Sequence, residues 1–349
     1  MHEYDLVHIH PGNARAQQQL DGLLHAAGIK RDAHLDYTVG LFDENGQLLA
    51  TGSTFASTLR CLAISPAHQG EGLLKHIVNF LVERQTERGY SEIFLYTKCE
   101  AAHFFEDLGF AEIARVPRQL VFMSNRRRAF PDYLAALKRN AAVPGRNISA
   151  IVMNANPFTL GHLHLLERAS FESDLVHCFV VSEDTSLVPA AVRYDLVRKG
   201  CAHLANIMCH PTGQYMVSNA TFPSYFLKDD RQVTETHARL DIEIFMQIAR
   251  VLNINRRFVG EEPTSGITQI YNEVMQECLP SHGISLTVLP RAHAGRTIIS
   301  ASTVRQMIHD RQLDEIRAFV PHSTYAFFTS EAGKAVIQRI QESTHVIHD

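Results

Sequence analysis

From residue 148 onward the chain alternates short apolar runs with amphipathic stretches, and this rhythm limits the fold more than any other feature. Residues 148–153, Ile-Ser-Ala-Ile-Val-Met, form an apolar, β-branched run typical of a buried parallel strand. A helix is expected next, over 161–170. Alternating strands and helices predict a parallel sheet with helices on both faces, which binds ligands at the carboxyl ends of its strands. The later strands and helices are expected at 175–181, 192–204, 241–251, 257–260, 267–278, 284–289 and 302–308.

Residues 1–125 follow a different pattern, in which short β-type runs alternate with two helical stretches. Strand candidates at 37–42 and 48–55 flank an Asp-Glu-Asn-Gly turn, which is typical of a β-hairpin. A helix over 71–88 carries its apolar residues at helical spacing. The other elements expected in this half are strands at 59–64, 92–97, 110–114 and 120–123 and a short helix at 101–108.

A basic segment at 126–146 separates the two halves. It opens with three arginines at 126–128, and a short helix is expected from Pro131. Over 115–146 the chain has eight Lys or Arg residues and one acid. Such a run is usually a solvated linker, but it could also dock an acidic partner. The expected organisation is a domain at 1–125, a basic linker at 126–146 and a second domain at 147–349.

The composition narrows the classes of function. With 33 basic and 37 acidic residues the formal net charge is −4, which argues against a protein that coats nucleic acid or an anionic membrane. We find no apolar run as long as a membrane span and no secretory signal at the N-terminus. The six cysteines form no CxxC pair, which favours reduced thiols and a cytoplasmic location. The twenty histidines form no HExxH motif, so no protein-held metal site is expected.

The densest chemical signal is the stretch 154–162, Asn-Ala-Asn-Pro-Phe-Thr-Leu-Gly-His, between the first buried strand and the first helix of the second half. Pro157 fixes the direction of the chain, and Gly161 lets a backbone or a ligand approach closely. The helix N-terminus offers free N–H groups and a positive dipole end, which suit phosphate. Thr159 adds a hydroxyl and His162 an imidazole donor. The alternative is a tight turn capped by the threonine.

A second motif, Ile-Ser-Ala-Ser-Thr-Val-Arg at 299–305, lies near the other end of this half. Ser300 and Ser302 would begin a helix, and Arg305, one turn in, can neutralise phosphate charge. The alternative is an ordinary helix cap with a surface arginine. Arg193 is a further candidate to face a nucleotide. Together, the two motifs resemble the (H/T)xGH and ISxSxxR signatures of the nucleotidyltransferase superfamily, whereas GxxxxGK[ST] and a GxGxxG after a strand are absent.

Three stretches resemble the citrate lyase ligase family: 154–162, then Ala-Thr-Phe-Pro-Ser-Tyr-Phe-Leu-Lys at 220–228, and Val-Gly-Glu-Glu-Pro-Thr-Ser at 259–265. In the second stretch, Ser224, Tyr225 and Lys228 either shape a pocket for acetate or belong to an apolar loop that packs its aromatic rings. The resemblance implies catalytic roles for Thr159, His162 and Arg305. The residues it implies for nucleotide and phosphate binding are Asn156, Pro157, Phe158, Gly161, Ser300, Ser302, Gly260 and Glu261.

The N-terminal half resembles GNAT acetyltransferases. Residues 66–74, Pro-Ala-His-Gln-Gly-Glu-Gly-Leu-Leu, resemble the Q/R-x-x-G-x-G/A loop that holds coenzyme A, and residues 102–110 resemble the later motif ending in Gly-Phe. Leu74 replaces the last small residue of the loop, which leaves the transferase activity open. The fold implied is a GNAT-like mixed α+β domain followed by a Rossmann-like parallel α/β nucleotidyltransferase domain. The residues of the possible coenzyme A loop are Gln69, Gly70 and Gly72.

The resemblance implies a two-step ligation. Acetate attacks the α-phosphorus of ATP, and pyrophosphate leaves as acetyl-adenylate forms. The thiol of a phosphopantetheine-type arm on the citrate lyase acyl carrier subunit then takes the acetyl group, and AMP leaves. Mg²⁺ would bridge the phosphates, and no cysteine of the chain acts as a nucleophile. Two alternatives stay open: an adenylyltransferase of the coenzyme A or NAD synthesis type, and a non-catalytic acetyl-CoA-binding or carrier-docking role for the N-terminal half.

Overall fold

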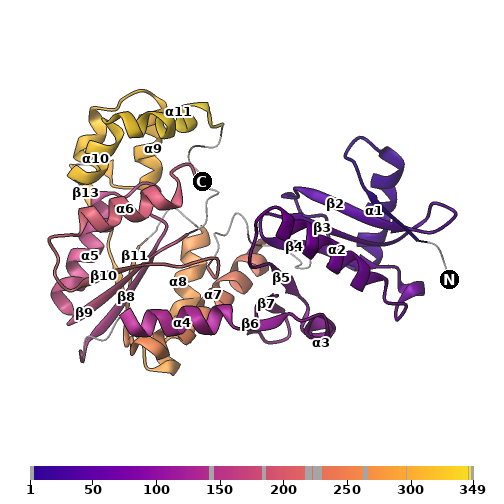
Figure 1. The fold of residues 1–349 in the computed structure, drawn as a ribbon. Helices are drawn as coiled ribbons and strands as arrows, with labels where there is room; N and C mark the ends of the chain where they lie inside the picture. The colour runs from indigo at the N-terminus through magenta and orange to yellow at the C-terminus, as the bar shows by residue number, and fades with distance from the viewer. Residues whose placement is uncertain are drawn as a thin grey trace. The chain divides into compact units, whose positions relative to one another are not determined.

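A computed structural model describes residues 4–140, 145–182, 186–216, 222, 230–261, 266–295, 297–344 and 346. The chain divides into two compact units, whose elements are labelled in Figure 1. Unit 1 comprises Met1–Tyr133 and Phe222–Glu243, and unit 2 comprises Leu134–Thr221 and Ile244–Asp349. The domain boundaries expected at 125 and 147 stay a proposal. One segment from the second half of the sequence, Phe222–Glu243, groups with unit 1. Among the described residues, no helix combines the length and the apolarity needed to cross a membrane.

Unit 1 is built on a seven-stranded mixed sheet in the order β1-β2-β3-β4-β5-β7-β6. Only β4 and β5 pair in parallel; the other neighbours are antiparallel. The strands are β1 (Asp5–His8), β2 (Tyr37–Phe42), β3 (Leu48–Phe55), β4 (Thr58–Ile64), β5 (Phe94–Thr97), β6 (Ala111–Val116) and β7 (Leu120–Ser124). The helices are α1 (Ala14–Ala26), α2 (Leu73–Glu87) and α3 (Ala102–Asp107).

The hairpin expected between β2 and β3 is confirmed. Asp43 Oδ1 accepts hydrogen bonds from the backbone N–H groups of Asn45 and Gln47, at 2.9 and 2.8 Å, and closes the turn. On one face of the sheet α2 lies close to β3: a Cβ added at Gly52 would come within 2.6 Å of the Ile77 side chain. The apolar spacing that predicted this helix therefore marks the face that it buries.

The other face of this sheet carries an aromatic cluster on β5 and β7. Phe122 stacks on Phe94 and Tyr96, with ring centroids 5.4 and 4.6 Å apart. Phe222 covers this cluster, because its ring lies 5.6 Å from that of Tyr96 and 4.3 Å from that of His237. Phe222 and His237, far along the sequence, thus contribute to the core of unit 1.

Unit 2 contains a five-stranded sheet in the order β10-β9-β8-β11-β12, and all its pairs are parallel. This confirms the fold class expected from the strand–helix rhythm. From β8 the chain adds β9 and β10 on one side of the sheet and then β11 and β12 on the other. The strand order therefore reverses between β8 and β11, and parallel sheets of this kind bind ligands at that point. The strands are β8 (Ile148–Met153), β9 (Leu175–Val180), β10 (Ile207–Pro211), β11 (Arg256–Gly260) and β12 (Ser285–Leu289).

Helices cover both faces of this sheet. On one face, the buried Leu166 of α5 and Leu196 of α6 pack in one cluster with Phe258 of β11. On the other face, Arg257 lies over the ring of Phe245 in α7, at 4.2 Å from its centroid. The helices are α5 (Leu160–Glu172), α6 (Ala190–Gly200), α7 (Asp230–Leu252), α8 (Gly266–Cys278), α9 (Ala301–His309), α10 (His322–Phe328) and α11 (Lys334–Glu342), and a small hairpin joins β13 (His293–Ala294) to β14 (Thr297–Ile298).

The basic segment contains a longer helix than expected, α4 (Ala129–Asn140). Within this segment Arg128 lies 3.7 Å from Asp132 with 85% of its side chain exposed, and just before it Arg115 of β6 pairs with Glu112. These solvated pairs agree with the linker interpretation, because exposed ion pairs of this kind form readily at surfaces. The docking interpretation stays a hypothesis.

Candidate functional site

The two motifs of unit 2 meet at the carboxyl edge of β8. Arg305 Nη1, in α9, donates to the carbonyl oxygen of Asn156 at 2.6 Å. A Cβ added at Gly161 would lie 3.3 Å from the carbonyl oxygen of Ile299, tighter than ordinary contacts. The segments 154–162 and 299–305 are therefore neighbours, and glycine is needed where α5 approaches the backbone of the second motif.

Thr159 and His162 form a capping box at the N-terminus of α5. The Thr159 backbone N–H donates to His162 Nδ1 at 3.1 Å, and the Thr159 hydroxyl lies 2.9 Å from the same nitrogen. In return, the His162 backbone N–H donates to Thr159 Oγ1 at 3.4 Å. Because Nδ1 accepts a hydrogen bond from the backbone, a neutral His162 carries its proton on Nε2.

Burial, together with the positive charge of Arg291, lowers the pKa of His162 from 6.5 to about 4. The imidazole is therefore neutral at pH 7, and Nε2–H is a hydrogen-bond donor. The ring also stacks on Phe158, with centroids 5.9 Å apart. The capping box fixes the orientation of this donor at the positive dipole end of α5, an arrangement suited to a phosphate oxygen.

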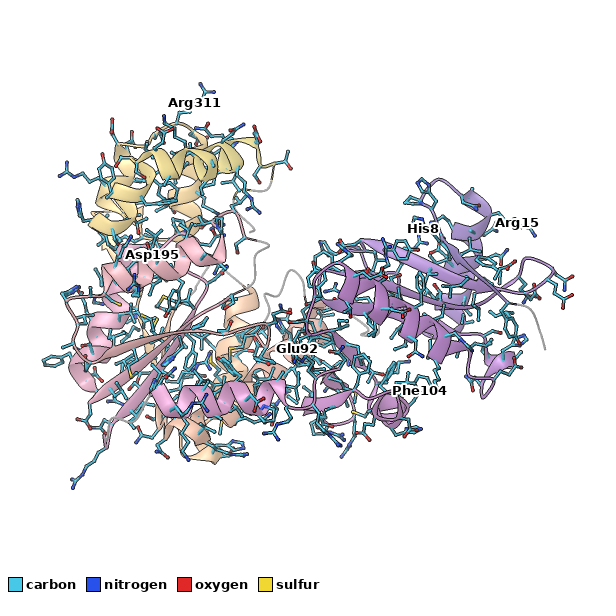
Figure 2. The ribbon with its side chains drawn as sticks, in the orientation of Figure 1. His8, Arg15, Glu92, Phe104, Asp195 and Arg311 are labelled. Atoms are coloured by element: carbon cyan, nitrogen blue, oxygen red, sulfur yellow. The ribbon has the colours of Figure 1, made fainter. Side chains whose placement is uncertain are left out.

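The loop between β8 and α5 is held from inside by Arg193 in α6. The guanidinium donates to the carbonyl oxygens of Asn154, Val181 and Val188 at 2.6–2.9 Å, and the side chain is fully buried. The expectation that Arg193 faces a nucleotide is therefore wrong, because its N–H groups bind the loop. On the same helix Asp195, which is labelled in Figure 2, forms ion pairs with Arg198 at 3.2 Å and with Lys199 at 2.6 Å.

Three of the residues expected at the nucleotide are buried in this loop: Asn156, Phe158 and Thr159 are at most 2% exposed. The ring of Phe158 packs so tightly on Gly200 that a Cβ there would come within 2.5 Å. Phe158 and Pro157, which follows Asn156 through a cis peptide bond, therefore shape the loop. Asn156 Oδ1 accepts the Val188 N–H at 3.0 Å, whereas its Nδ2 has no hydrogen-bond partner among the described residues.

The second motif starts α9. Ser300 is the N-cap, and its Oγ accepts the Thr303 N–H at 3.0 Å and lies 3.0 Å from Ser302 Oγ. Arg305 is 3% exposed and its Nε donates to the carbonyl oxygen of Val346 at 2.8 Å. The alternative of a surface arginine is therefore wrong. In this structure Arg305 joins α9 to the β8–α5 loop, and a contact with phosphate stays a proposal.

The end of β11 adds Gly260 and Glu261 to the same edge. The Glu261 N–H donates to the Leu289 carbonyl oxygen at 2.8 Å, which continues the pairing of β11 with β12. A Cβ added at Gly260 would meet nothing within 4 Å, so packing within the protein does not require glycine here. Arg291, two residues after β12, lies at this same edge of the sheet. The sequence interpretation did not include it, although an arginine shortly after a predicted parallel strand is a signal for such a position.

The other expected sites lie elsewhere. Ser224, Tyr225 and Lys228 fall outside the described residues, so the acetate pocket stays an expectation. In unit 1, Gln69, Gly70 and Gly72 precede α2, and both glycines have positive φ, 90° and 76°. Between them Glu71 places a carboxylate, bound by the Tyr4 hydroxyl at 3.2 Å, in a loop where coenzyme A phosphates would bind. Among the residues that the structure describes, no three His, Cys, Asp or Glu side chains form a metal-binding group.

The comparisons with known proteins agree with this geometry. The model of the citrate lyase ligase C-terminal domain matches residues 148–328, and that of the GNAT acetyltransferase family matches 15–110. A citrate pro-3S-lyase ligase of Klebsiella pneumoniae is 36% identical over 317 residues, covering 89% of this chain and 92% of the relative. This chain belongs to the citrate lyase ligase family. The ligase of the same name from Escherichia coli K12 is 36% identical over 304 residues, covering 84% of this chain and 86% of the relative.

Membership of the citrate lyase ligase family confirms the resemblance drawn from 154–162, 220–228 and 259–265, and it makes the chain an enzyme of ligase type. The match to the GNAT family likewise confirms the fold expected for the N-terminal half. Among solved structures, Escherichia coli ElaA is 15% identical with a TM-score of 0.31, covering 36% of this chain and 99% of that chain.

Proposed function

We propose that this chain uses ATP to activate acetate as acetyl-adenylate and then acetylates the thiol of the prosthetic arm on the citrate lyase acyl carrier subunit. The observation that carries the proposal is the contact between the two motifs, in which Arg305 binds the Asn156 carbonyl and Gly161 approaches that of Ile299. Both helix N-termini thereby point at one edge of a parallel sheet. Membership of the citrate lyase ligase family supports the choice of substrates.

In the first step an acetate oxygen forms a bond to the α-phosphorus of ATP, and the bond to the bridging oxygen of pyrophosphate breaks. Acetate reacts as its carboxylate, so no base has to remove a proton. Negative charge grows on the phosphoryl oxygens and on the leaving pyrophosphate. The Nε2–H of His162 and the N-termini of α5 and α9 can stabilise that charge, and Asn156 Nδ2 offers a further donor.

In the second step the carrier thiol forms a bond to the acetyl carbon, and the bond to AMP breaks. Two thiols of the protein are held in the protonated form, which makes them poor nucleophiles. Burial raises the pKa of Cys61 to about 11, and hydrogen bonding between thiols together with burial raises that of Cys209 to about 12. The acetyl group therefore passes directly to the carrier, and catalysis rests on positioning and charge stabilisation.

Magnesium enters with the substrate in this proposal. The described residues offer no group of three metal-ligating side chains, so the ion would be held by the phosphates of ATP. The six cysteines, all within the described residues, form no disulfide bond, which supports a reducing, cytoplasmic location.

Acetate-dependent exchange of labelled pyrophosphate into ATP tests the proposal. Exchange reports the first step alone and needs no carrier protein, so we expect it with acetate and only weakly with larger carboxylates. Phosphopantetheine and nicotinamide mononucleotide, offered in place of acetate, test the adenylyltransferase alternative. ATP-dependent adenylylation of either compound, without acetate-dependent exchange, would overturn the proposal.

A further inference from the structure

Arg291 lies directly after β12, at the same edge of the sheet as the Thr159–His162 pair. Its Nε donates to the carbonyl oxygen of Glu261 at 2.8 Å, and its Nη1 lies 3.4 Å from the carbonyl oxygen of Ile299. One side chain thus connects the ends of β11 and β12 with the segment that begins α9. These contacts hold the guanidinium in a defined orientation.

The Ile299 carbonyl also shows how close Arg291 comes to α5. The same oxygen lies 3.3 Å from the position of a Cβ at Gly161, in the first turn of that helix. Arg291 and the N-terminus of α5 therefore meet at one carbonyl group. The charge of Arg291 reaches His162 strongly enough to help lower its pKa. The cation and two helix N-termini together concentrate positive potential at this edge.

Arg291 is partly buried, and burial lowers its own pKa. Removing the guanidinium from water makes its charge costly, and an anion beside it would offset that cost. Two of its contacts, with the carbonyl oxygens of Glu261 and Ile299, orient the group. A guanidinium held in this way can bind two oxygens of one phosphate at once.

We propose that Arg291 is a phosphate-binding residue, which grips the leaving pyrophosphate of ATP with two N–H groups from the β11–β12 side while α5 binds it from the β8 side. This inference rests on the function proposed above. It adds a residue that neither motif contains, and it assigns the cation that links the ends of β11 and β12 to the leaving group.

The test compares Arg291→Gln with Arg291→Lys and with Arg339→Gln, a control on the exposed side of α11. We expect Arg291→Gln to weaken the binding of inorganic pyrophosphate and to raise the KM for ATP roughly 10- to 100-fold, the loss expected for a charge-assisted pair. The KM for acetate should change little. Arg291→Lys keeps the charge but loses the second N–H, so intermediate binding is expected. The control should behave as the native protein.

A second readout separates phosphate binding from a merely structural role. In Arg291→Gln the pKa of His162, followed by NMR of its ring, should rise, whereas Arg291→Lys should keep it low. Native-like pyrophosphate affinity and ATP KM in a folded Arg291→Gln would overturn the inference; if that variant does not fold, native-like pyrophosphate binding by Arg291→Lys would overturn it. If the native chain lacks acetate-dependent exchange, the proposed function fails, but the pyrophosphate measurements still decide the role of Arg291.

Discussion

At the scale of single residues, Thr159 and His162 show how a helix cap can also orient a side-chain hydrogen-bond donor. The cap requires His162 Nδ1 to accept the Thr159 N–H, and this requirement places the imidazole proton on Nε2. Burial and Arg291 keep the ring neutral, so the donor is available throughout the neutral pH range. Local helix capping and phosphate recognition therefore depend on the same two side chains.

Replacing His162 by alanine should lower the rate of acetate-dependent pyrophosphate exchange by ~10²–10³, the loss expected for one oriented donor. His164→Ala is the matched control, because His164 lies two residues later on the same helix with an exposed side chain. Its rate should stay native. Exchange that persists in a folded His162→Ala protein would remove this residue from the mechanism.

A second residue-scale prediction concerns pH and the buried pair His177–His210, whose Nδ1 and Nε2 lie 2.9 Å apart. Burial lowers the pKa of both to about 4, and His210 adds to the effect on His177. Unfolded histidines titrate near 6.5, so between pH 6.5 and 4 the unfolded chain binds more protons and stability falls as pH falls.

The pair should lose on the order of 4 kcal/mol at pH 5, about 2 for each histidine, measured as the change in the free energy of urea unfolding relative to pH 7. The double variant His177→Gln, His210→Gln should lose much of this pH dependence. His203→Gln, on an exposed histidine, should retain it. An unchanged loss in the double variant would contradict the assignment.

The sequence singled out the residues of the two motifs but not the contacts that they make, and their roles at a nucleotide stay a prediction. Thr159, Gly161 and His162 were recognisable because the strand-to-helix junction of a parallel sheet constrains local chemistry. Arg291 was missed because its one local signal, a position shortly after a predicted parallel strand, does not separate it from the other arginines. Its position depends on the pairing of β11 with β12, and its effect on His162 depends on burial.

At the scale of elements, α6 stabilises the site without touching the open edge. It directs Arg193 inward to the loop carbonyls and carries Asp195, Arg198 and Lys199 in ion pairs. The sequence predicted this helix, but its periodicity could not show that the inward residue is an arginine bound to carbonyl groups. Sequence patterns count an arginine as a surface residue, and here backbone acceptors reverse that preference.

Arg193→Met should lower the free energy of unfolding by roughly 2–4 kcal/mol, because the carbonyl oxygens of Asn154, Val181 and Val188 would lose a buried donor. Urea unfolding followed by circular dichroism measures the change. Arg198→Met, with a mostly exposed side chain on the same helix, should cost less than about 1 kcal/mol. Equal effects of the two substitutions would show that Arg193 does not anchor the loop.

The sequence pattern predicted only part of the helix α7. Its apolar spacing predicted only 241–251, whereas the helix begins at Asp230. The earlier turns bury polar side chains instead, such as Thr236, whose hydroxyl donates to Gln119 at 2.6 Å. Residues 230–243 group with unit 1 and the later turns with unit 2.

At the scale of the whole molecule, unit 1 is built from two separated stretches of sequence. The sequence predicted a boundary near 125 because the strand rhythm changes there. It could not show that Phe222 and the first half of α7 return to cover Phe94, Tyr96 and Phe122. Such long-range packing leaves no local signal.

A fragment of residues 1–146 should therefore expose the aromatic cluster, bind a hydrophobic dye and lose its near-ultraviolet circular dichroism. Joining residues 222–243 to the fragment through a flexible linker should restore a folded state. In the full chain, Phe222→Ala should cost about 3 kcal/mol, as for a buried phenylalanine. A well-folded fragment 1–146 would contradict this account of unit 1.

The return of residues 222–243 to the first unit also restricts how relatives of this protein can recombine. A chimera made by one crossover near residue 140 would combine the sheet of one parent with the covering segment of the other. The aromatic contacts at Tyr96 and Phe222 would then come from different ancestors. Exchange of a functional acetyltransferase-like half requires two further crossovers, one on each side of residues 222–243. Both pieces of unit 1 then come from the same parent.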